Sequence, residues 1–334
     1  MPIRPILLKG HSRPLTKVKF NRDGDLLFTC GKDHKPNVWY AENGERLGTY
    51  NGHNGSVYDC DINYFSTRLL TGSADCSIKL WDVKNGSELF SWQHKSGVRS
   101  VSFAEGERMF MAVTDQTFSS QPTIFIYNLS EFDSEGNHQG QETSPVREMF
   151  VPGSNVKMCG ALWGQLNSTI IAAYDDGSVR IWDVESGQEI YKVQEHKKQI
   201  NSLQFSHDRT MIITASSDHT AKIYDAKTLQ LLKTFTSDRP LNSAALSPLF
   251  NHVIVGGGQE AMNVTNTSSK VGHFEVDFYH LVYGDFLGSV KGHFGPVNTV
   301  AFNTNGKSFA SGAEDGYIRL HHFDSQYFNA KNNF

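Results

Sequence analysis

Three residues in the first quarter of the chain carry the side chains of a hydrolytic triad. His53 lies 22 residues before Asp75, and the hydroxyl of Thr71 stands four residues before the same aspartate. Histidine, hydroxyl and carboxylate are the base, the nucleophile and the orienting acid of acyl-transfer enzymes. The trio could therefore perform nucleophilic catalysis, or it could join strands through buried hydrogen bonds.

The same residue types recur along the chain at the same spacing. Histidine and aspartate are 22 residues apart in four places, and a hydroxyl stands four residues before each aspartate. An enzyme needs one catalytic site, whereas a repeated fold needs one such set per unit. We therefore expect these residues to be structural and the chain to be no enzyme. In three of the four places an aromatic residue also follows the aspartate by six positions. The four sets are His11, Thr29, Asp33 and Trp39; His53, Thr71, Asp75 and Trp81; His196, Thr214, Asp218 and Tyr224; and His293, Ser311 and Asp315.

The segments that must position these residues have the pattern of short β-strands. Ile78 and Leu80 flank Lys79, as Val179 and Ile181 flank a basic residue in a later copy. Alternate residues of a strand point to opposite faces of its sheet. Glycine-containing turns such as ENGE and ESGQ follow these segments, as hairpin turns do. A repeat of about 42 residues with four short strands is typical of a propeller blade.

Two dipeptides mark the repeats. Gly-His occurs at 10–11, 52–53 and 292–293, and Trp-Asp occurs at 81–82 and 182–183. With these motifs, residues 3–324 resemble the WD-repeat family. The resemblance implies an all-β fold, a seven-bladed β-propeller of WD40 repeats whose stacked blades bury one another. It also implies that histidine, hydroxyl, aspartate and tryptophan form a hydrogen-bonded tetrad within a blade.

One domain of seven blades accounts for the whole length, residues 1–334. The last repeat lacks a fourth strand, and we expect residues 4–10 to supply it and close the ring. The repeats are expected at about 3–41, 44–83, 86–129, 146–184, 187–226, 229–281 and 284–324, with a tail at 325–334.

Three of the expected repeats are irregular. Gln93-His94 replaces Gly-His in the third, and the fourth lacks the histidine. In the sixth, Asp238 and Glu260 stand at the histidine and aspartate positions. Polar segments at 130–145 and 262–273 are predicted to be insertions.

The remaining motifs indicate no cofactor, no metal and no membrane span. The segment GGGQEA at 256–261 lacks the ending of a phosphate-binding loop. His321 and His322 are neighbours in an expected strand, so they point to opposite faces and cannot share a zinc ion.

Composition points to a soluble cytoplasmic protein. The net charge of −4 comes without a basic stripe, which argues against direct nucleic-acid binding. The four cysteines lack CxxC spacing, as is typical of reduced intracellular thiols.

The irregular repeats support a more specific resemblance. The segments at 24–33, 43–53, 256–269 and 290–328 are similar to the i subunits of eukaryotic translation initiation factor three. The chain departs from that family's pattern at HFEVD (273–277), so surface details of the sixth blade are less transferable.

This resemblance implies a non-catalytic protein-interaction scaffold. Such a subunit docks a helix of the b subunit, contacts the g subunit, and supports assembly of the 43S pre-initiation complex and mRNA recruitment. It reaches the small ribosomal subunit only indirectly. The resemblance also implies that carboxylates around the fifth blade meet the helix, and by position these match Asp208 and Asp225.

Two alternatives stay open at this stage. A WD40 signalling adaptor would bind receptors or kinases on the same fold, because a fold alone does not give a function. An enzyme could use the 256–273 region as an active-site loop, but the sequence offers no nucleophile and base outside the repeats.

Overall fold

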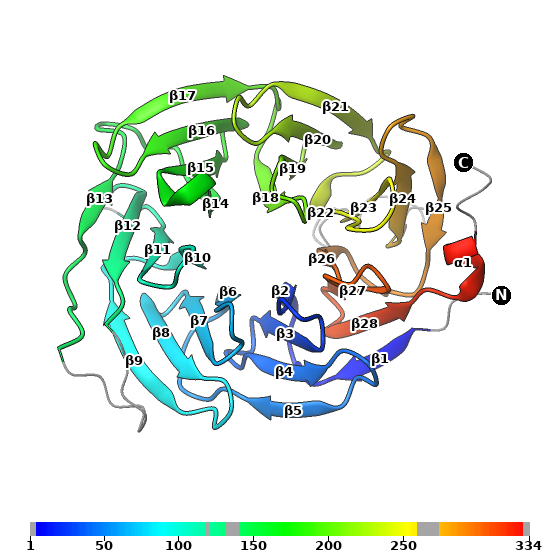
Figure 1. Ribbon diagram of the computed structural model, residues 1–334, viewed down its shortest axis with the longest axis horizontal. Helices are drawn as coiled ribbons and strands as arrows, with labels where there is room; N and C mark the ends of the chain where they lie inside the picture. Colours follow the sequence, from blue (N-terminus) through cyan, green and yellow to red (C-terminus); the bar gives the residue numbers. More distant parts are fainter. Residues whose placement is uncertain (1–4, 118–119, 131–139, 259–273, 330–334) are drawn as a thin grey trace, which may run out of the picture.

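The strands of the chain form seven four-stranded antiparallel sheets arranged as a ring (Figure 1). The computed structural model describes residues 5–117, 120–130, 140–258 and 274–329. The expected seven-bladed β-propeller is confirmed. Among the described residues, only a 3-10 turn, η1 (Gln165–Asn167), and a short helix, α1 (Ser325–Asn329), are helical, and no described helix is long and apolar enough to cross a membrane.

Each blade runs from a first strand at the centre of the ring to a fourth strand at its rim. The first four blades consist of β2 (Leu15–Phe20), β3 (Leu26–Gly31), β4 (Asn37–Tyr40) and β5 (Arg46–Thr49); β6 (Val57–Ile62), β7 (Arg68–Ser73), β8 (Ser77–Asp82) and β9 (Glu88–Gln93); β10 (Val98–Phe103), β11 (Met109–Thr114), β12 (Thr123–Asn128) and β13 (Arg147–Met149); and β14 (Met158–Trp163), β15 (Thr169–Tyr174), β16 (Ser178–Asp183) and β17 (Glu189–Gln194). The last three consist of β18 (Ile200–Phe205), β19 (Met211–Ser216), β20 (Thr220–Asp225) and β21 (Leu231–Thr236); β22 (Leu241–Leu246), β23 (His252–Gly257), β24 (Val276–His280) and β25 (Phe286–Val290); and β26 (Val297–Phe302), β27 (Ser308–Ala313), β28 (Tyr317–His322) and β1 (Ile6–Lys9).

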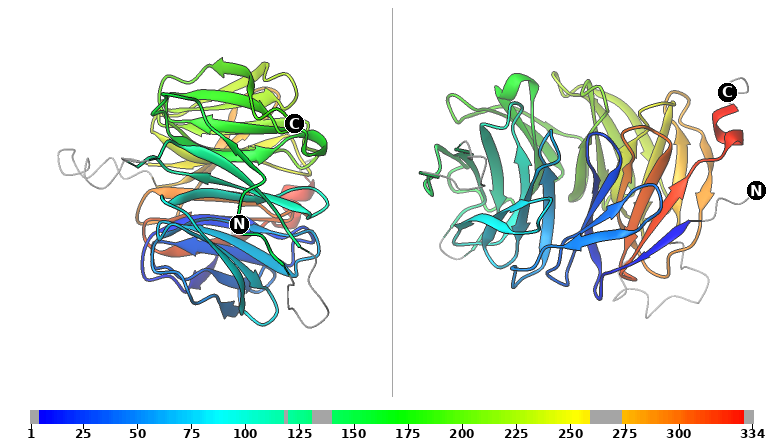
Figure 2. Two further views of the ribbon diagram at one scale, coloured as in Figure 1. Left: turned by 90° about the vertical axis from the view of Figure 1, so that its left-hand side faces the viewer. Right: turned by 60° about the horizontal axis from the view of Figure 1, so that its bottom comes forward.

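The ring closes where the two ends of the chain meet in the seventh blade. β1 pairs antiparallel with β28, with Ile6 opposite Leu320 and Leu8 opposite Ile318; Figure 2 shows the two strands side by side. The predicted closure by the N-terminal strand is confirmed. Leu8 is buried in one apolar cluster with both β28 residues, so burial as well as backbone pairing holds the closing strand.

The start of the predicted polar tail is ordered and packed. Tyr327 of α1 stacks on Phe323 with ring centroids 3.9 Å apart, and its hydroxyl lies 2.8 Å from Nδ1 of His252 in the sixth blade. The helix α1, which follows the last strand of the chain, therefore links the seventh blade to the sixth.

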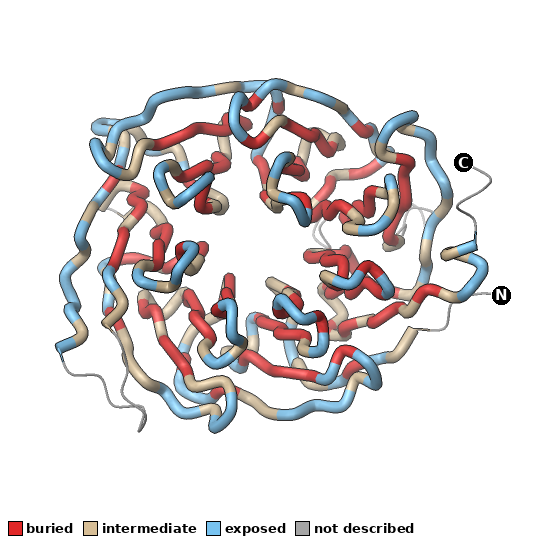
Figure 3. Tube along the Cα trace, in the orientation of Figure 1, coloured by how far each residue is buried: buried red, intermediate tan, exposed pale blue. Residues whose placement is uncertain are grey.

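The core of the protein lies between blades, as Figure 3 shows by the buried inner strands and exposed rim. The second strand of a blade packs against the first strand of the next blade, and glycines occur at this contact. A Cβ on Gly72 of β7 would lie 2.8 Å from Val98 of the next blade, and one on Gly256 of β23 would lie 2.6 Å from Val297. Glycine at these positions permits the close approach of the following blade.

Candidate functional site

The structure brings the members of the second-blade set together. Nδ1 of His53 lies 2.9 Å from the Asp75 carboxylate, and Nε2 lies 2.7 Å from the Thr71 hydroxyl. Nε1 of Trp81 donates to the same hydroxyl at 2.8 Å. These bonds join the loop before β6, the strands β7 and β8, and the turn between them.

The other three predicted sets share the contacts of histidine with the aspartate and the hydroxyl, and the first-blade set also has the tryptophan bond. In the fifth blade, His196 lies 2.9 Å from Asp218 and 2.7 Å from the Thr214 hydroxyl. In the seventh, His321 replaces the tryptophan and stacks on Phe309 with ring centroids 4.5 Å apart. In the first blade, His11 lies 2.9 Å from Asp33 and 2.8 Å from the Thr29 hydroxyl, to which Trp39 donates at 2.9 Å. In the seventh, His293 lies 3.1 Å from Asp315 and 2.8 Å from the Ser311 hydroxyl. Tyr224 is fully buried at the tryptophan position of the fifth blade.

The hydroxyl that would serve as nucleophile is inaccessible. Thr71 has no exposed surface, and its oxygen is already bonded to His53 and Trp81. A nucleophile must reach a bound substrate within about 3–3.5 Å, and here no substrate can approach. The arrangement can connect strands, but it cannot attack a carbonyl group.

The carboxylate of each tetrad is stabilised in its charged form. Burial opposes ionisation of Asp75, but hydrogen bonds from His53, Ser77 and the Asn54 amide outweigh it and hold the pKa well below its ordinary value. In the fifth blade, hydrogen bonds from Thr220, the Lys197 amide and His196 likewise outweigh the effect of burial and lower the pKa of Asp218 to about 2. At neutral pH each of these aspartates is an anion that accepts several hydrogen bonds.

The fourth blade replaces the tetrad with residues that the sequence analysis did not identify. Trp182 donates to the hydroxyl of Tyr174 at 3.0 Å instead of to a threonine. Arg180 lies 4.1 Å from the centre of the Tyr174 ring and donates to Asp176 and Glu189 at 3.1 and 3.0 Å. A buried arginine thus holds the aspartate in this blade; the sequence placed a basic residue here, as in other repeats, but gave no sign of these contacts.

The third and sixth blades form other polar pairs. His94 bonds to the hydroxyl of Tyr127 at 3.2 Å, while Asp115 pairs with Arg99 at 2.6 Å. In the sixth blade, the buried Arg239 donates to Asp277 at 2.5 Å. Glu260, the 262–273 insertion and most of the 130–145 insertion lie outside the described residues. Of the GGGQEA segment, the first two glycines end strand β23.

Asp208 and Asp225 lie in neighbouring turns on one face of the fifth blade. Asp208 follows β18 and Asp225 ends β20; the two turns touch because the Ala226 amide donates to the Thr210 carbonyl at 2.9 Å. Asp208 is exposed and Asp225 is half-buried. The structure therefore places both carboxylates where a partner can reach them.

Each of the two carboxylates also caps its own turn, which the sequence analysis did not foresee. Asp208 accepts hydrogen bonds from the hydroxyls of Ser206 and Thr210 at 2.5 and 2.8 Å. Asp225 accepts from the amide and hydroxyl of Thr228 at 2.7 and 2.8 Å. These bonds lower the pKa of both groups, so both are charged at neutral pH.

Comparison with known proteins identifies the family. Residues 3–333 match the EIF3I family model. The chain is 49% identical to eukaryotic translation initiation factor 3 subunit I of Taeniopygia guttata, over 98% of both chains. It is 47% identical to the same subunit of Homo sapiens over 98% of both chains, and of Nematostella vectensis over 97% of this chain and 98% of the relative. The chain belongs to the eukaryotic translation initiation factor 3 subunit I family.

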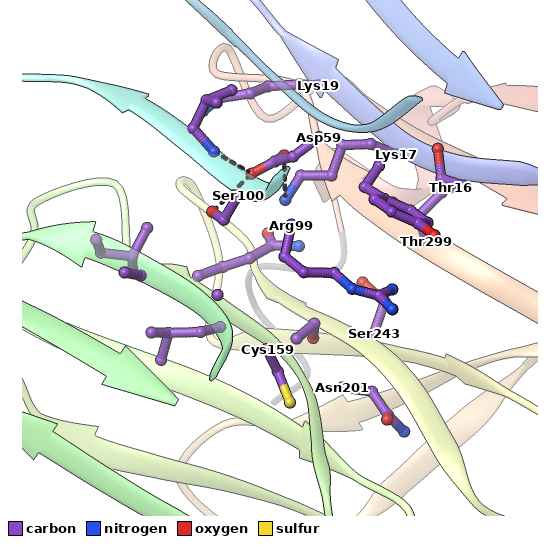
Figure 4. A pocket seen from close by; sticks show the side chains of 18 of the residues that line it. Thr16, Lys17, Lys19, Asp59, Arg99, Ser100, Cys159, Asn201, Ser243 and Thr299 are labelled. Carbon is purple, nitrogen blue, oxygen red and sulfur yellow. Dashed lines mark hydrogen bonds and ion pairs between the residues drawn. The ribbon is translucent and has the colours of Figure 1, made fainter. Parts of the chain in front are cut away.

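In this member of the subunit I family, the centre of the ring is lined by paired charges. Lys17 pairs with Asp59 at 3.1 Å, and Ser100 donates to the same carboxylate at 2.8 Å, as Figure 4 shows. Lys19 pairs with Asp61 at 2.6 Å. Burial raises the pKa of the Cys159 thiol in this cavity to about 12. Each cation that lines this cavity has a carboxylate partner, since Arg99 pairs with Asp115 at 2.6 Å.

Among the described residues, no cluster of three or more histidine, cysteine, aspartate or glutamate side chains could hold a metal ion. His321 is neutral and buried, and burial lowers its pKa to about 3.

Proposed function

We propose that the chain is a non-catalytic scaffold subunit of eukaryotic translation initiation factor 3 in the cytoplasm. It docks a helix of the b subunit and contacts the g subunit, and so supports assembly of the 43S pre-initiation complex and mRNA recruitment. It binds no nucleic acid directly and meets the small ribosomal subunit through its neighbours. The observation that carries the proposal is the match to subunit I relatives over 98% of both chains.

The charges of the fifth blade support helix docking. Within the described residues, neither Asp208 nor Asp225 forms an ion pair. Arg209, next to Asp208 in sequence, instead pairs with Glu105 and donates to the Trp163 carbonyl. The two carboxylates are thus left without a cation, which a lysine or arginine of a basic helix would supply.

A WD40 signalling adaptor is the alternative, and affinity purification distinguishes the two. We expect that the tagged chain, expressed at its natural level, co-purifies with the other subunits of initiation factor 3 as the most enriched proteins. An untagged strain is the control. Enrichment of receptors or kinases without initiation factor subunits would contradict the proposal.

A further inference from the structure

Arg319 of the seventh blade lacks the carboxylate partner that its counterparts in the second and fourth blades have. Lys79, at the same position of the second blade, pairs with Glu88 of the fourth strand at 2.6 Å. In the fourth blade, Arg180 pairs with Glu189 of the fourth strand at 3.0 Å. The fourth strand of the seventh blade is β1, with the sequence ILLK, which contains no acidic residue. Within the described residues Arg319 forms no ion pair, and its Nε atom is buried without a hydrogen-bond partner.

Two further cations lie at the same end of the seventh blade. Lys9 pairs with Tyr317, two residues before Arg319 in β28, so the three side chains share one face of the sheet. Nζ of Lys9 lies 5.8 Å from the centre of the Tyr317 ring. Arg13 is exposed in the loop after β1, and this loop packs on the turn before β28, where a Cβ on Gly316 would lie 3.3 Å from the Arg13 carbonyl oxygen. In the described part of the chain, neither Lys9 nor Arg13 forms an ion pair.

An exposed phenylalanine lies beside these cations. Phe294 is 82% exposed, and the centre of its ring is 6.0 Å from the guanidinium carbon of Arg319. Its backbone amide donates to the Asp315 carboxylate at 3.1 Å, so the histidine–aspartate pair of the blade also fixes the loop that carries the phenylalanine. Aromatic and arginine side chains are the residues that contribute most to protein–protein contacts.

The carboxylates nearby have partners of their own and do not neutralise the three cations. Two of them belong to the histidine–aspartate pairs of the first and seventh blades, and two are glutamates paired with lysines. The surface therefore keeps an excess of positive charge around an apolar ring. The four pairs are His11 with Asp33, His293 with Asp315, Lys32 with Glu314, and Lys291 with Glu275.

We propose that this surface, formed by Lys9, Arg13, Phe294, Tyr317 and Arg319, binds an acidic peptide segment of a partner protein. A carboxylate of the segment meets Arg319 and Lys9 in place of the missing glutamate, while an apolar side chain packs on Phe294. An acidic peptide fits better than RNA because Arg319 stands where other blades bind a single carboxylate. Three cations around a phenylalanine also do not form the basic stripe of a nucleic-acid site.

The proposed surface goes beyond the docking of the b subunit, because it lies on the other face of the ring. β28, the third strand of the seventh blade, begins at this surface with Tyr317. β20, the third strand of the fifth blade, ends with Asp225 on the opposite face. A partner on the seventh blade therefore leaves the turns of the fifth blade free.

A synthetic peptide of glutamates around one central tryptophan tests the proposal. The fluorescent peptide is titrated with the full-length chain at physiological salt, and anisotropy is expected to show saturable binding with a Kd of about 100 μM or lower. Arg319→Gln with Lys9→Gln is expected to weaken binding about ten-fold or more, and Phe294→Ser about five-fold. Lys84→Gln with Lys307→Gln removes the same charge from two exposed lysines on the other face. This matched control is expected to bind as the wild type does.

A second variant supplies the missing carboxylate within the chain. Leu7 is directly opposite Arg319 in the pairing of β1 with β28 and is 40% exposed, so Leu7→Glu places a carboxylate beside the guanidinium group. We expect this variant to fold and to bind the peptide about ten-fold more weakly. Leu7→Gln, which has the same length without the charge, is expected to keep the wild-type affinity.

The proposal is wrong if the wild-type chain shows no saturable binding of the peptide, or if Leu7→Glu and Leu7→Gln bind it equally well. It is also wrong if an oligouridine RNA of equal charge binds more tightly than the peptide, since the surface would then be a nucleic-acid site. None of these results bears on the docking of the b subunit, because the b subunit is absent from the experiment.

Discussion

Asp75→Ala is expected to lower the melting temperature by about 10 °C while leaving the folded fraction able to bind its partner. The Asp75 carboxylate accepts hydrogen bonds from His53 at 2.9 Å, from the hydroxyl of Ser77 at 2.6 Å and from the Asn54 amide at 2.9 Å. Alanine would leave these donors without a partner inside the blade. Breaking such a buried pair costs about 3–5 kcal/mol, and each kcal/mol lowers the melting temperature of a large domain by about 2–4 °C.

The control for this substitution is an aspartate outside any tetrad. Asp23 lies exposed in the turn between β2 and β3, and Asp23→Ala is expected to change stability by no more than about 0.5 kcal/mol. Thermal unfolding followed by circular dichroism measures both variants. If Asp75→Ala melts within two degrees of Asp23→Ala, as an approximate limit, the tetrad does not stabilise the blade.

The protein is expected to lose stability steadily as the pH falls from about 6.5 to about 4. Burial lowers the pKa of His94 to about 4 and that of His321 to about 3. In the unfolded chain these histidines bind protons near pH 6.5, whereas in the folded chain they stay neutral. The unfolded state therefore gains protons first, and each histidine removes about 1.4 kcal/mol of stability per pH unit in this range.

A second loss of stability is expected below about pH 4 and comes from carboxylates instead of imidazoles. There the aspartates of the tetrads, whose folded pKa is lowered, must accept protons and give up their hydrogen bonds. The stability that Asp218 provides is fully present above the unfolded pKa of about 3.9 and is lost as the pH falls toward about 2, its folded pKa.

His321→Phe isolates the contribution of one histidine. Phenylalanine preserves the stacking on Phe309 and removes the titrating ring. Urea unfolding between pH 6.5 and 4 is expected to show a slope of free energy against pH that is shallower by about 1.4 kcal/mol per unit. An unchanged slope would show that His321 does not titrate differently in the two states.

The periodic features of the sequence predicted the regular part of the structure. The four sets of histidine, hydroxyl and aspartate, and the strands around them, repeat at fixed spacing, because each of these blades packs in the same way. The fourth blade could not be predicted in this way, since Tyr174 and Arg180 replace the tetrad by a different geometry that only the folded neighbours reveal. The order of α1 was missed for the same reason: Tyr327 packs on His252 of another blade, a contact with no local signal.

The candidate site, too, could be predicted only in part from the sequence. Resemblance to the subunit I family pointed to Asp208 and Asp225, and the structure places them in adjoining turns. A hollow of about 320 Å³ lies beside Asp208, between the fourth and fifth blades, and it was not predicted, because Leu166, Phe205 and Ala226 meet only when two blades stack. The bond between Arg209 and Glu105 also joins turns that are 104 residues apart in sequence.

Helix docking on the fifth blade is tested most directly by reversing its two charges. Asp208→Lys with Asp225→Lys is compared with Asp208→Asn and Asp225→Asn, because asparagine keeps an oxygen that can cap the turn. We expect both double variants to fold, with binding of the b subunit reduced in the asparagine variant. In the lysine variant it should fall about 100-fold or more and co-purification should be lost at physiological salt, since each charged contact contributes about 1.5–3 kcal/mol. Wild-type recovery of the b subunit by the folded lysine variant would contradict docking through these carboxylates.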